Sequence, residues 1–163
     1  MSIHESTDNQ ITQFLTFELA GEAYGVEILK VREIRGWEPV RKLPDTPDFI
    51  KGALNLRGSI VPIVDLRERF NMPPVEYSPM TVVIVLSVQP VEAGGTVMGI
   101  IADAVSDVLD VNPADIKQTP NLGSKINTCY MRGMYVRESG MVLLLDVDRL
   151  LNPEEFANMP GLR

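Results

Sequence analysis

Residues Phe49–Phe70 read FIKGALNLRGSIVPIVDLRERF, two apolar segments on either side of Arg57-Gly58-Ser59. Leucines alternate with polar residues over Leu54–Arg57, the period of a half-buried strand, and Ile60–Val64 is β-branched apart from Pro62. Because glycine favours the turn between them, we predict a β-hairpin. Proline cannot donate to a sheet ladder, so the second strand is predicted either to lie at an edge or to face away from a partner at Pro62.

A short helix is predicted directly after this hairpin, over Leu66–Phe70. Asp65 can cap its N-terminus by accepting a hydrogen bond from a free backbone N–H group. Glu68 stands three residues later and can act as the reciprocal half of a capping box.

The hairpin and its helix recur 81 residues later, and the strand and turn upstream recur at an offset of 74. Gly52 to Asp65 and Gly133 to Asp146 both span 13 steps. Matched positions are Gly52 with Gly133, Asp65 with Asp146, Val31 with Val105, Glu33 with Asp107, and Ile34 with Val108. This pattern predicts one structural unit written twice, with length differences confined to loops.

Each copy is predicted to contain four or five short strands with brief helical segments, which favours a pair of small β-barrels over a parallel sheet. Hairpins are expected over 13–28 and 81–101, and short helices over Ile28–Ile34 and Ala102–Val111. We expect a disordered tail over residues 1–12, a folded region over 13–151 and a C-terminal turn and tail over 152–163. The first barrel is placed at about 13–72 and the second at about 80–151, with strands able to cross over.

Composition excludes several classes of protein. The 163-residue chain has a net charge of −7, which argues against nucleic acid as a partner because phosphates demand a basic face. No apolar run approaches the ~20 residues of a membrane span, and the polar start of the chain is not a secretory signal. A single cysteine, Cys129, fits a reducing compartment. We therefore expect a soluble cytoplasmic protein.

Charge is unevenly distributed along the chain, at −5 over residues 1–29, +3 over 30–69 and −5 over 70–163. The basic segment contains Lys30, Arg32, Arg35, Arg41, Lys42 and Arg57. It is interpreted either as a solvated basic helix or as a face for an acidic partner.

Catalytic chemistry is not indicated. The only histidine, His4, lies in the predicted tail, and no phosphate-binding loop, nucleophile elbow or His/Cys metal cluster occurs in the sequence. Asp65 and Asp146 could suggest a two-carboxylate hydrolase, but helix capping explains both. Asp103, Asp107 and Asp110 are interpreted as a solvated face and not as a cation site. We expect no metal and no cofactor.

Glu33 and Arg57 leave two interpretations open. Arg57 is replaced by Glu138 in the second copy, whereas Glu33 is matched by Asp107, so the repeat itself does not require Arg57. The two residues could form a surface ion pair worth ~0–1 kcal/mol. They could equally form a contact specific to the first copy.

Several motifs in a fixed order resemble the bacterial chemotaxis coupling protein family, CheW. These are Tyr24–Ile28, Val31–Gly36, Phe49–Gly52, Asn55–Gly58 with Pro62–Leu66, and Val105–Leu109, and the match runs from about Gln13 to Leu151. The resemblance implies two intertwined SH3-like five-stranded barrels with short helices. It implies a non-enzymatic adaptor that joins the regulatory domain of the histidine kinase CheA to the cytoplasmic tips of methyl-accepting chemoreceptors in membrane arrays.

The resemblance also implies two contact sets. Receptor coupling is associated with the positions of Val31, Glu33, Arg57 and Val108, and one kinase contact with those of Lys117 and Leu122. Asn121 stands where the family often has an acidic residue, and the loop over 89–95 is longer than usual. The alternatives are a module of this type cut from a larger enzyme and a free-standing hydrolase.

Overall fold

The computed structural model describes residues 10–42, 50–70, 72–73, 75–88, 96–118 and 130–151, and the chain is mainly β-structure there. The strands are β1 Thr12–Leu19, β2 Glu22–Glu27, β3 Val31–Gly36, β4 Ile50–Leu56, β5 Ser59–Asp65, β6 Val82–Val88, β7 Thr96–Ala102, β8 Ala104–Val111, β9 Met131–Arg137 and β10 Gly140–Leu145. The helical segments are η1 Ile28–Lys30, α2 Leu66–Arg69, η3 Pro113–Asp115 and α3 Val147–Leu150. None of the helices among these residues is long and apolar enough to cross a bilayer.

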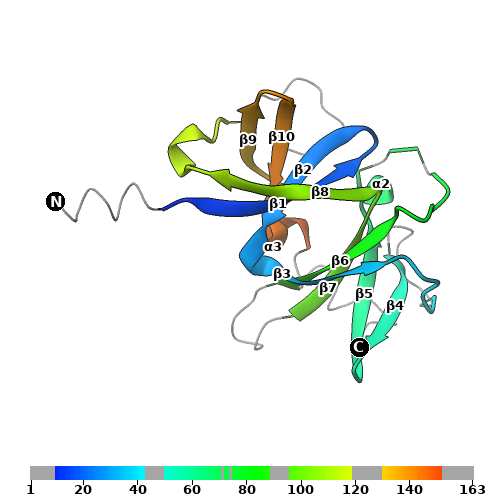
Figure 1. Ribbon diagram of the computed structural model, residues 1–163. Coiled ribbons are helices and arrows are strands. Elements are labelled where there is room, and N and C mark those ends of the chain that lie inside the picture. The colour runs from blue at the N-terminus through cyan, green and yellow to red at the C-terminus, as the bar shows by residue number, and fades with distance from the viewer. Residues whose placement is uncertain are drawn as a thin grey trace.

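The strands form two five-stranded sheets that each mix strands from both copies of the repeat (Figure 1). Barrel A has the strand order β8-β1-β2-β10-β9, and barrel B has the order β3-β6-β7-β5-β4. The chain thus crosses from barrel A to barrel B between β2 and β3, and returns between β7 and β8. The predicted pair of intertwined five-stranded barrels is confirmed. Neither sheet corresponds to a continuous stretch of the chain such as 13–72 or 80–151.

In the part of the chain that the structure describes, one isolated β-bridge connects the two edges of each sheet. In barrel B, Arg41 follows β3 and bridges Ala53 of β4 through N–H···O bonds of 2.7 and 3.1 Å. In barrel A, Lys117 follows β8 and bridges Met134 of β9 through bonds of 2.8 and 2.9 Å. These bridges satisfy backbone groups at the sheet edges and curl each sheet into a barrel.

The central hairpin has the predicted form, β4 and β5 joined by a tight turn. Both turn residues have positive φ, 51° at Arg57 and 90° at Gly58, and the Asn55 side chain accepts the Gly58 N–H at 3.0 Å. Positive φ at both positions matches the right-handed twist of the flanking strands. β4 and β5 therefore pair in the register that places Leu54 opposite Val61.

The backbone nitrogen of Pro62 faces away from the neighbouring strand β4. This confirms one of the two predictions for Pro62, that it faces away from a pairing partner. Ala53, its register partner, directs its N–H and carbonyl groups to Arg41, so the Ala53–Pro62 pair exchanges no hydrogen bonds. The proline nitrogen therefore faces β7, where pairing begins one residue later at Ile63 and Gly99. The alternative, an edge strand, is wrong because β5 lies between β4 and β7.

Two predicted helices are strands. Only Ile28–Lys30 of the first forms a helical turn, a 3₁₀ turn, and the segment continues as β3; the second, Ala102–Val111, is mostly β8. Both pair along one edge with a buried strand, β3 with β6 and β8 with β1, each through a register shift. The apolar spacing that suggested a helix is overridden by this pairing, since strand formation depends on tertiary neighbours.

The predicted helix caps are confirmed at both repeats. An Asp65 carboxylate oxygen accepts the Arg67 N–H at 2.9 Å, and Asp146 accepts the Arg149 N–H at 3.2 Å. The capping box is not formed as predicted, because Glu68 pairs instead with Lys51 at 2.7 Å. Both carboxylates are thus explained by local structure.

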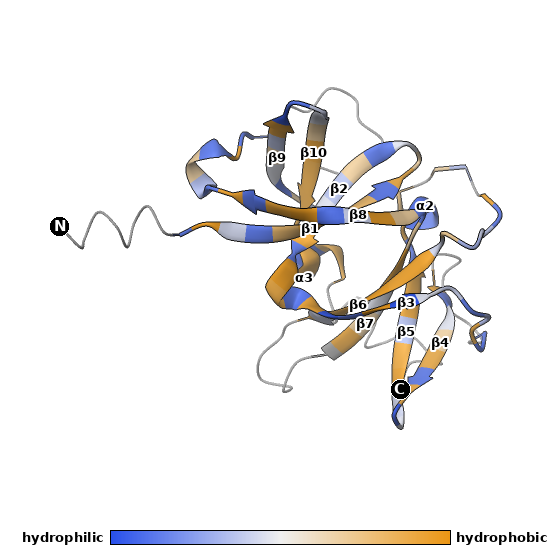
Figure 2. Cartoon of the chain, viewed as in Figure 1, coloured by the Kyte–Doolittle hydropathy of each residue, from blue (hydrophilic) through white to orange (hydrophobic). Residues whose placement is uncertain are grey.

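Three clusters of buried hydrophobic side chains occur among the described residues. One lies in barrel B around Val61, Ile63 and Val83, and one in barrel A around Phe14 and Val142. The largest lies between the barrels and takes side chains from both of them and from α2 and α3. Figure 2 shows the hydrophobic stretches along the strands that bound these clusters, such as β6 and β7. The barrels therefore share a core and form one packed unit.

Candidate partner-binding surface

β3 presents the first two predicted receptor-contact residues at the edge of barrel B. Burial alternates along this strand, with Val31, Glu33 and Arg35 half-buried and the residues between them exposed. Val31 packs against the central hydrophobic cluster. Its side chain therefore links this edge to the junction between the barrels.

Glu33 and Arg57 are brought together although they lie 24 residues apart. Two guanidinium nitrogens of Arg57 donate to one Glu33 carboxylate oxygen at 3.1 and 3.2 Å. Arg35 donates to the other oxygen at 3.1 Å. The Glu33 side chain is 24% exposed and that of Arg57 is 76% exposed, so the hairpin turn holds a cation in solvent above a sheltered anion.

The pKa of the Glu33 carboxyl is held below its usual value, first by the hydrogen bond from Arg35 and then by that from Arg57, against the opposing effect of burial. Glu33 is therefore an anion throughout the neutral range. Because both of its oxygens are engaged, the charge that this site offers to a partner is the Arg57 guanidinium.

Barrel A contains a matching ion pair that the sequence did not predict. Asp107, the counterpart of Glu33, pairs with Arg137 at 3.4 Å, and Arg137 ends β9 just before the turn. The Thr16 hydroxyl contacts the Asp107 carboxylate and accepts the Asp107 N–H at 3.0 Å. These partners hold the Asp107 pKa below its usual value, with Thr16 the largest cause. The missed signal was an arginine one residue before the turn position that Arg57 occupies.

Val108, the fourth predicted receptor contact, lies on the outer strand β8 of barrel A and is 49% exposed. Its counterpart in the repeat, Ile34 on β3, is 44% exposed. Val108 is the register partner of Leu15, whereas Asp107 bonds to Thr16, so the side chains of Val108 and Asp107 leave opposite faces of β8. No contact within the described residues joins Val108 to Val31, Glu33 or Arg57.

The predicted kinase contacts lie elsewhere. Lys117 is exposed in the bridge that connects the edges of barrel A. Leu122, like Cys129 and His4, lies outside the described residues. The structure therefore separates Lys117 from the Glu33–Arg57 pair by placing the two on different barrels.

The three aspartates that are predicted to form a solvated face each have a separate partner. Asp103 pairs with Arg67 at 2.7 Å, Asp107 with Arg137, and Asp110 accepts from Gln13 at 2.9 Å. No group of three or more metal-ligating side chains occurs among the described residues.

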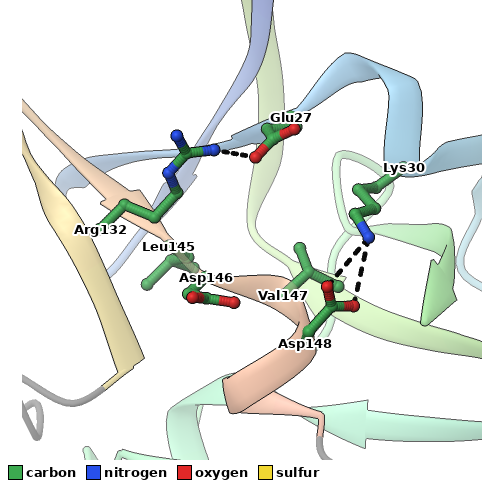
Figure 3. Close-up of a pocket in the computed structure, with 7 residues that line it drawn as sticks. All are labelled: Glu27, Lys30, Arg132, Leu145, Asp146, Val147 and Asp148. Atoms are coloured by element: carbon green, nitrogen blue, oxygen red, sulfur yellow. Dashed lines mark hydrogen bonds and ion pairs between the residues drawn. The ribbon is translucent and has the colours of Figure 1, made fainter. Parts of the chain in front are cut away.

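A small cavity of about 150 Å³ lies between η1, α3 and the start of β9 (Figure 3). Two ion pairs cross it, Arg132 with Glu27 and Lys30 with Asp148 at 3.0 Å. These two pairs neutralise one another, and Asp146, which also lines the cavity, pairs with Arg149 at 3.7 Å, so little net charge remains for a ligand. The Lys30–Asp148 pair ties the crossover segment η1 to α3.

The interpretation of the basic segment as a face for an acidic partner is only partly supported. The other interpretation, a solvated basic helix, is wrong because most of that segment forms strand β3 and not a helix. Lys30 and Arg35 are occupied by Asp148 and Glu33, respectively. Arg57 is paired but remains mostly exposed.

The two barrels share one core and hold an exposed arginine above a sheltered glutamate, an arrangement typical of small binding modules. Residues 13–155 match the family model described as a CheW-like domain. The chain is 46% identical over 145 residues to chemotaxis protein CheW of Klebsiella aerogenes, covering 89% of this chain and 84% of that protein. It is 36% identical over 143 residues to chemotaxis protein CheW of Rhizobium meliloti, covering 88% and 89%.

A solved structure supports the same assignment. The crystal structure of scaffolding protein TtCheW from Thermoanaerobacter tengcongensis superposes with a TM-score of 0.77 and 30% identity, covering 86% of this chain and 88% of that one. The chain therefore belongs to the CheW family. This membership supports a role as a chemotaxis adaptor.

Proposed function

We propose that the protein is a non-enzymatic adaptor that couples the regulatory domain of the histidine kinase CheA to the cytoplasmic tips of methyl-accepting chemoreceptors. It would work in the cytoplasm, recruited to receptor arrays at the membrane. The observation that carries the proposal is the exposed Arg57 guanidinium, held at the tip of a rigid hairpin by Glu33. The relatives named as chemotaxis and scaffolding proteins support the class of function.

The receptor face in this proposal contains Val31, Glu33, Arg57 and Val108. A well-placed apolar side chain beside an oriented charge suits a protein contact, because burial contributes affinity and charge fixes orientation. Val31 and Val108 supply the apolar part, and Val108 is exposed enough to be covered on binding. Arg57 supplies a cation that can meet an acidic residue of the receptor.

The kinase face in this proposal contains Lys117 and Leu122. Lys117 is exposed on barrel A, which also carries Val108 on β8, whereas the Glu33–Arg57 pair lies on barrel B. Two separate faces on one packed unit would hold receptor and kinase at high effective concentration. Control of the kinase would then arise from unequal binding to its active and inactive states.

Single substitutions at the two faces test this proposal. Arg57→Asp should weaken binding to a soluble receptor cytoplasmic fragment by about tenfold or more and spare binding to the kinase. Leu122→Asp should do the reverse. Either should abolish receptor control of the kinase in a reconstituted array, measured as ATP-dependent autophosphorylation.

Two matched controls share the chemistry of these changes. Arg149 is 69% exposed on α3, so Arg149→Asp makes the same charge change at a distant site. Leu29 is 89% exposed, so Leu29→Asp matches the change at Leu122. Both controls should bind both partners normally. If one substitution at either face removes both interactions in a folded protein, the two-face adaptor is refuted.

A further inference from the structure

In each barrel, a hairpin and the helix that follows it come from one copy of the repeat and dock in parallel on a strand from the other copy. We call these hairpin–helix units. The unit β4-β5-α2 pairs through β5 with β7, and the unit β9-β10-α3 pairs through β10 with β2. Because β2 and β7 occupy equivalent places in the repeat, the repeat alone allows either unit to dock on either strand.

The shape of the two docking strands does not distinguish the units. Gly99 of β7 is the register partner of Ile63, and its counterpart Gly25 of β2 is the register partner of Leu144. A Cβ atom on Gly99 would lie 2.7 Å from the Ile63 side chain, and one on Gly25 would lie 3.1 Å from the Leu144 side chain. Each glycine thus makes room for a large aliphatic residue, and isoleucine and leucine have similar volumes.

The ion pairs near the hairpin turns do not distinguish the units either. Both hairpins carry an arginine at or beside the turn, Arg57 and Arg137, and both edge strands carry an acid, Glu33 and Asp107. A hairpin that moved to the other barrel would again bring an arginine to an acid.

The charges on the two helices do distinguish the units. Arg67 and Asp148 are the second residues of α2 and α3, equivalent places in the repeat that carry opposite charges. Arg67 donates to Asp103, which directly follows β7, at 2.7 and 3.3 Å. Asp148 accepts from Lys30, at the end of the turn that follows β2, at 3.0 and 3.2 Å (Figure 3). A basic helix residue therefore meets an acidic crossover in barrel B, and the reverse holds in barrel A.

We propose that these two ion pairs are a recognition code that directs each hairpin–helix unit to its own barrel as the chain folds. If the units exchanged barrels, Arg67 would meet Lys30 and Asp148 would meet Asp103. Arg67 and Lys30 are only 14% and 23% exposed in their present places, so like charges there would meet with little screening by solvent. Like charges brought together oppose the wrong pairing, and opposite charges favour the right one. The opposite polarity of the two pairs thus acts against the exchanged fold.

An exchange of the helix charges tests the proposal. The full chain with Arg67→Asp and Asp148→Arg makes both present placements like-charged and both exchanged placements complementary. Nuclear Overhauser effects between strands show which unit docks where, because Gly99 lies beside Ile63 in the present fold and would lie beside Leu144 after exchange. We expect a second set of resonances with the exchanged contacts, in about a tenth of the molecules or more.

Reversing the crossover charges as well provides the rescue. Adding Lys30→Asp and Asp103→Lys to the exchange variant restores two complementary pairs of reversed polarity, so the present fold should return as a single species. If the exchange variant is folded and shows only the present contacts between strands, the ion pairs are merely structural and the proposal is overturned.

A neutral variant decides the question if the exchange variant does not fold. Arg67→Gln with Asp148→Asn removes the code without adding repulsion, and it should refold from urea about threefold or more slowly than the parent, because misdocked units must separate before they dock correctly. Lys51→Gln with Glu68→Gln is the matched control, since that ion pair lies within one unit, and it should refold at the parent's rate. Refolding of the neutral variant at the parent's rate, or equal slowing in the control, overturns the proposal.

Discussion

Gly52 offers the sharpest test of the barrel closure. Its φ is +154°, a region that side chains rarely adopt, and a Cβ atom there would overlap the carbonyl oxygen of Arg41. The same Cβ would lie 2.8 Å from both the Arg41 carbonyl carbon and a Val40 methyl group. Because the Arg41 carbonyl is backbone held by the bridge to Ala53, it cannot move without breaking that bridge. Gly52→Ala should therefore open the edge of barrel B.

The expected cost follows from two contributions. Positive φ at a non-glycine residue costs about 1–3 kcal/mol. The two lost backbone hydrogen bonds contribute about 0.5–1.5 kcal/mol each. Together they predict a loss of about 2–6 kcal/mol in the free energy of unfolding, against a typical total of about 5–15 kcal/mol. The melting temperature should fall by about 4–24 °C, at about 2–4 °C per kcal/mol for a domain of this size.

Thermal and urea unfolding, followed by circular dichroism, measure this loss, and two other glycines separate its causes. Gly36 has an ordinary φ and open space, so Gly36→Ala should change stability little. Gly140 has φ +133° and open space, so Gly140→Ala should show the backbone strain without the clash. Gly133 has φ +152° with a Cβ position 2.5 Å from the Lys117 carbonyl oxygen, so Gly133→Ala should resemble Gly52→Ala. A Gly52→Ala protein within 1 kcal/mol of the parent would refute the reasoning.

Two further predictions concern the junction between the barrels. Phe70 is 2% exposed; its ring stacks on Tyr24 with the ring centroids 6.3 Å apart and packs at a tilt against Tyr130 at 6.4 Å. Phe70→Ala should therefore lower the free energy of unfolding by about 3–5 kcal/mol in the same measurement. Burial raises the pKa of Asp103, but hydrogen bonds from Arg67 and the Ala20 N–H outweigh it and leave the pKa below its usual value. Because its pKa is depressed in the folded state, the Asp103 carboxylate stabilises the fold at pH values above the unfolded-state pKa of about 4, and this stabilisation is lost as the pH falls through the lower folded-state pKa. Asp103→Asn should therefore cost about 1.5–3 kcal/mol in the free energy of unfolding at pH 7 and much less near pH 2, measured by urea unfolding. Equal costs at both pH values would contradict this prediction.

The duplication was predictable because it depends on local requirements. Gly52 and Gly133 share the same strained φ, and Asp65 and Asp146 cap equivalent helices. Such features depend on a few neighbouring residues, so they leave a repeated pattern in the sequence. Which strands belong to which barrel was not predictable from local requirements. Pairing of β3 with β6 and of β8 with β1 joins residues far apart in the chain, and both edge strands have apolar spacing that also fits a helix.

Only part of the candidate site was predictable from the sequence. The sequence indicated a Glu33–Arg57 ion pair as one of two interpretations, and the structure forms it. It missed Arg137 because the repeat aligns Arg57 with Glu138, and the second barrel draws its arginine from one residue earlier. An ion pair formed by long side chains tolerates such a shift, whereas glycines and caps do not. Exact positional matching therefore finds backbone requirements more reliably than side-chain pairs.

The shared core explains how an adaptor without catalytic chemistry could transmit a signal. Each crossover between the barrels is tied by an ion pair to a short helix, Lys30 to Asp148 in one half and Asp103 to Arg67 in the other. A hinge between the barrels would have to break these pairs and expose the central hydrophobic cluster. Exposing such a cluster costs about 25 cal/mol for each Å² of apolar surface, so the barrels should move as one body. A receptor bound at one face would then fix the position and orientation of a kinase bound at the other, and a change in receptor geometry would reach the kinase as a change in which of its states fits.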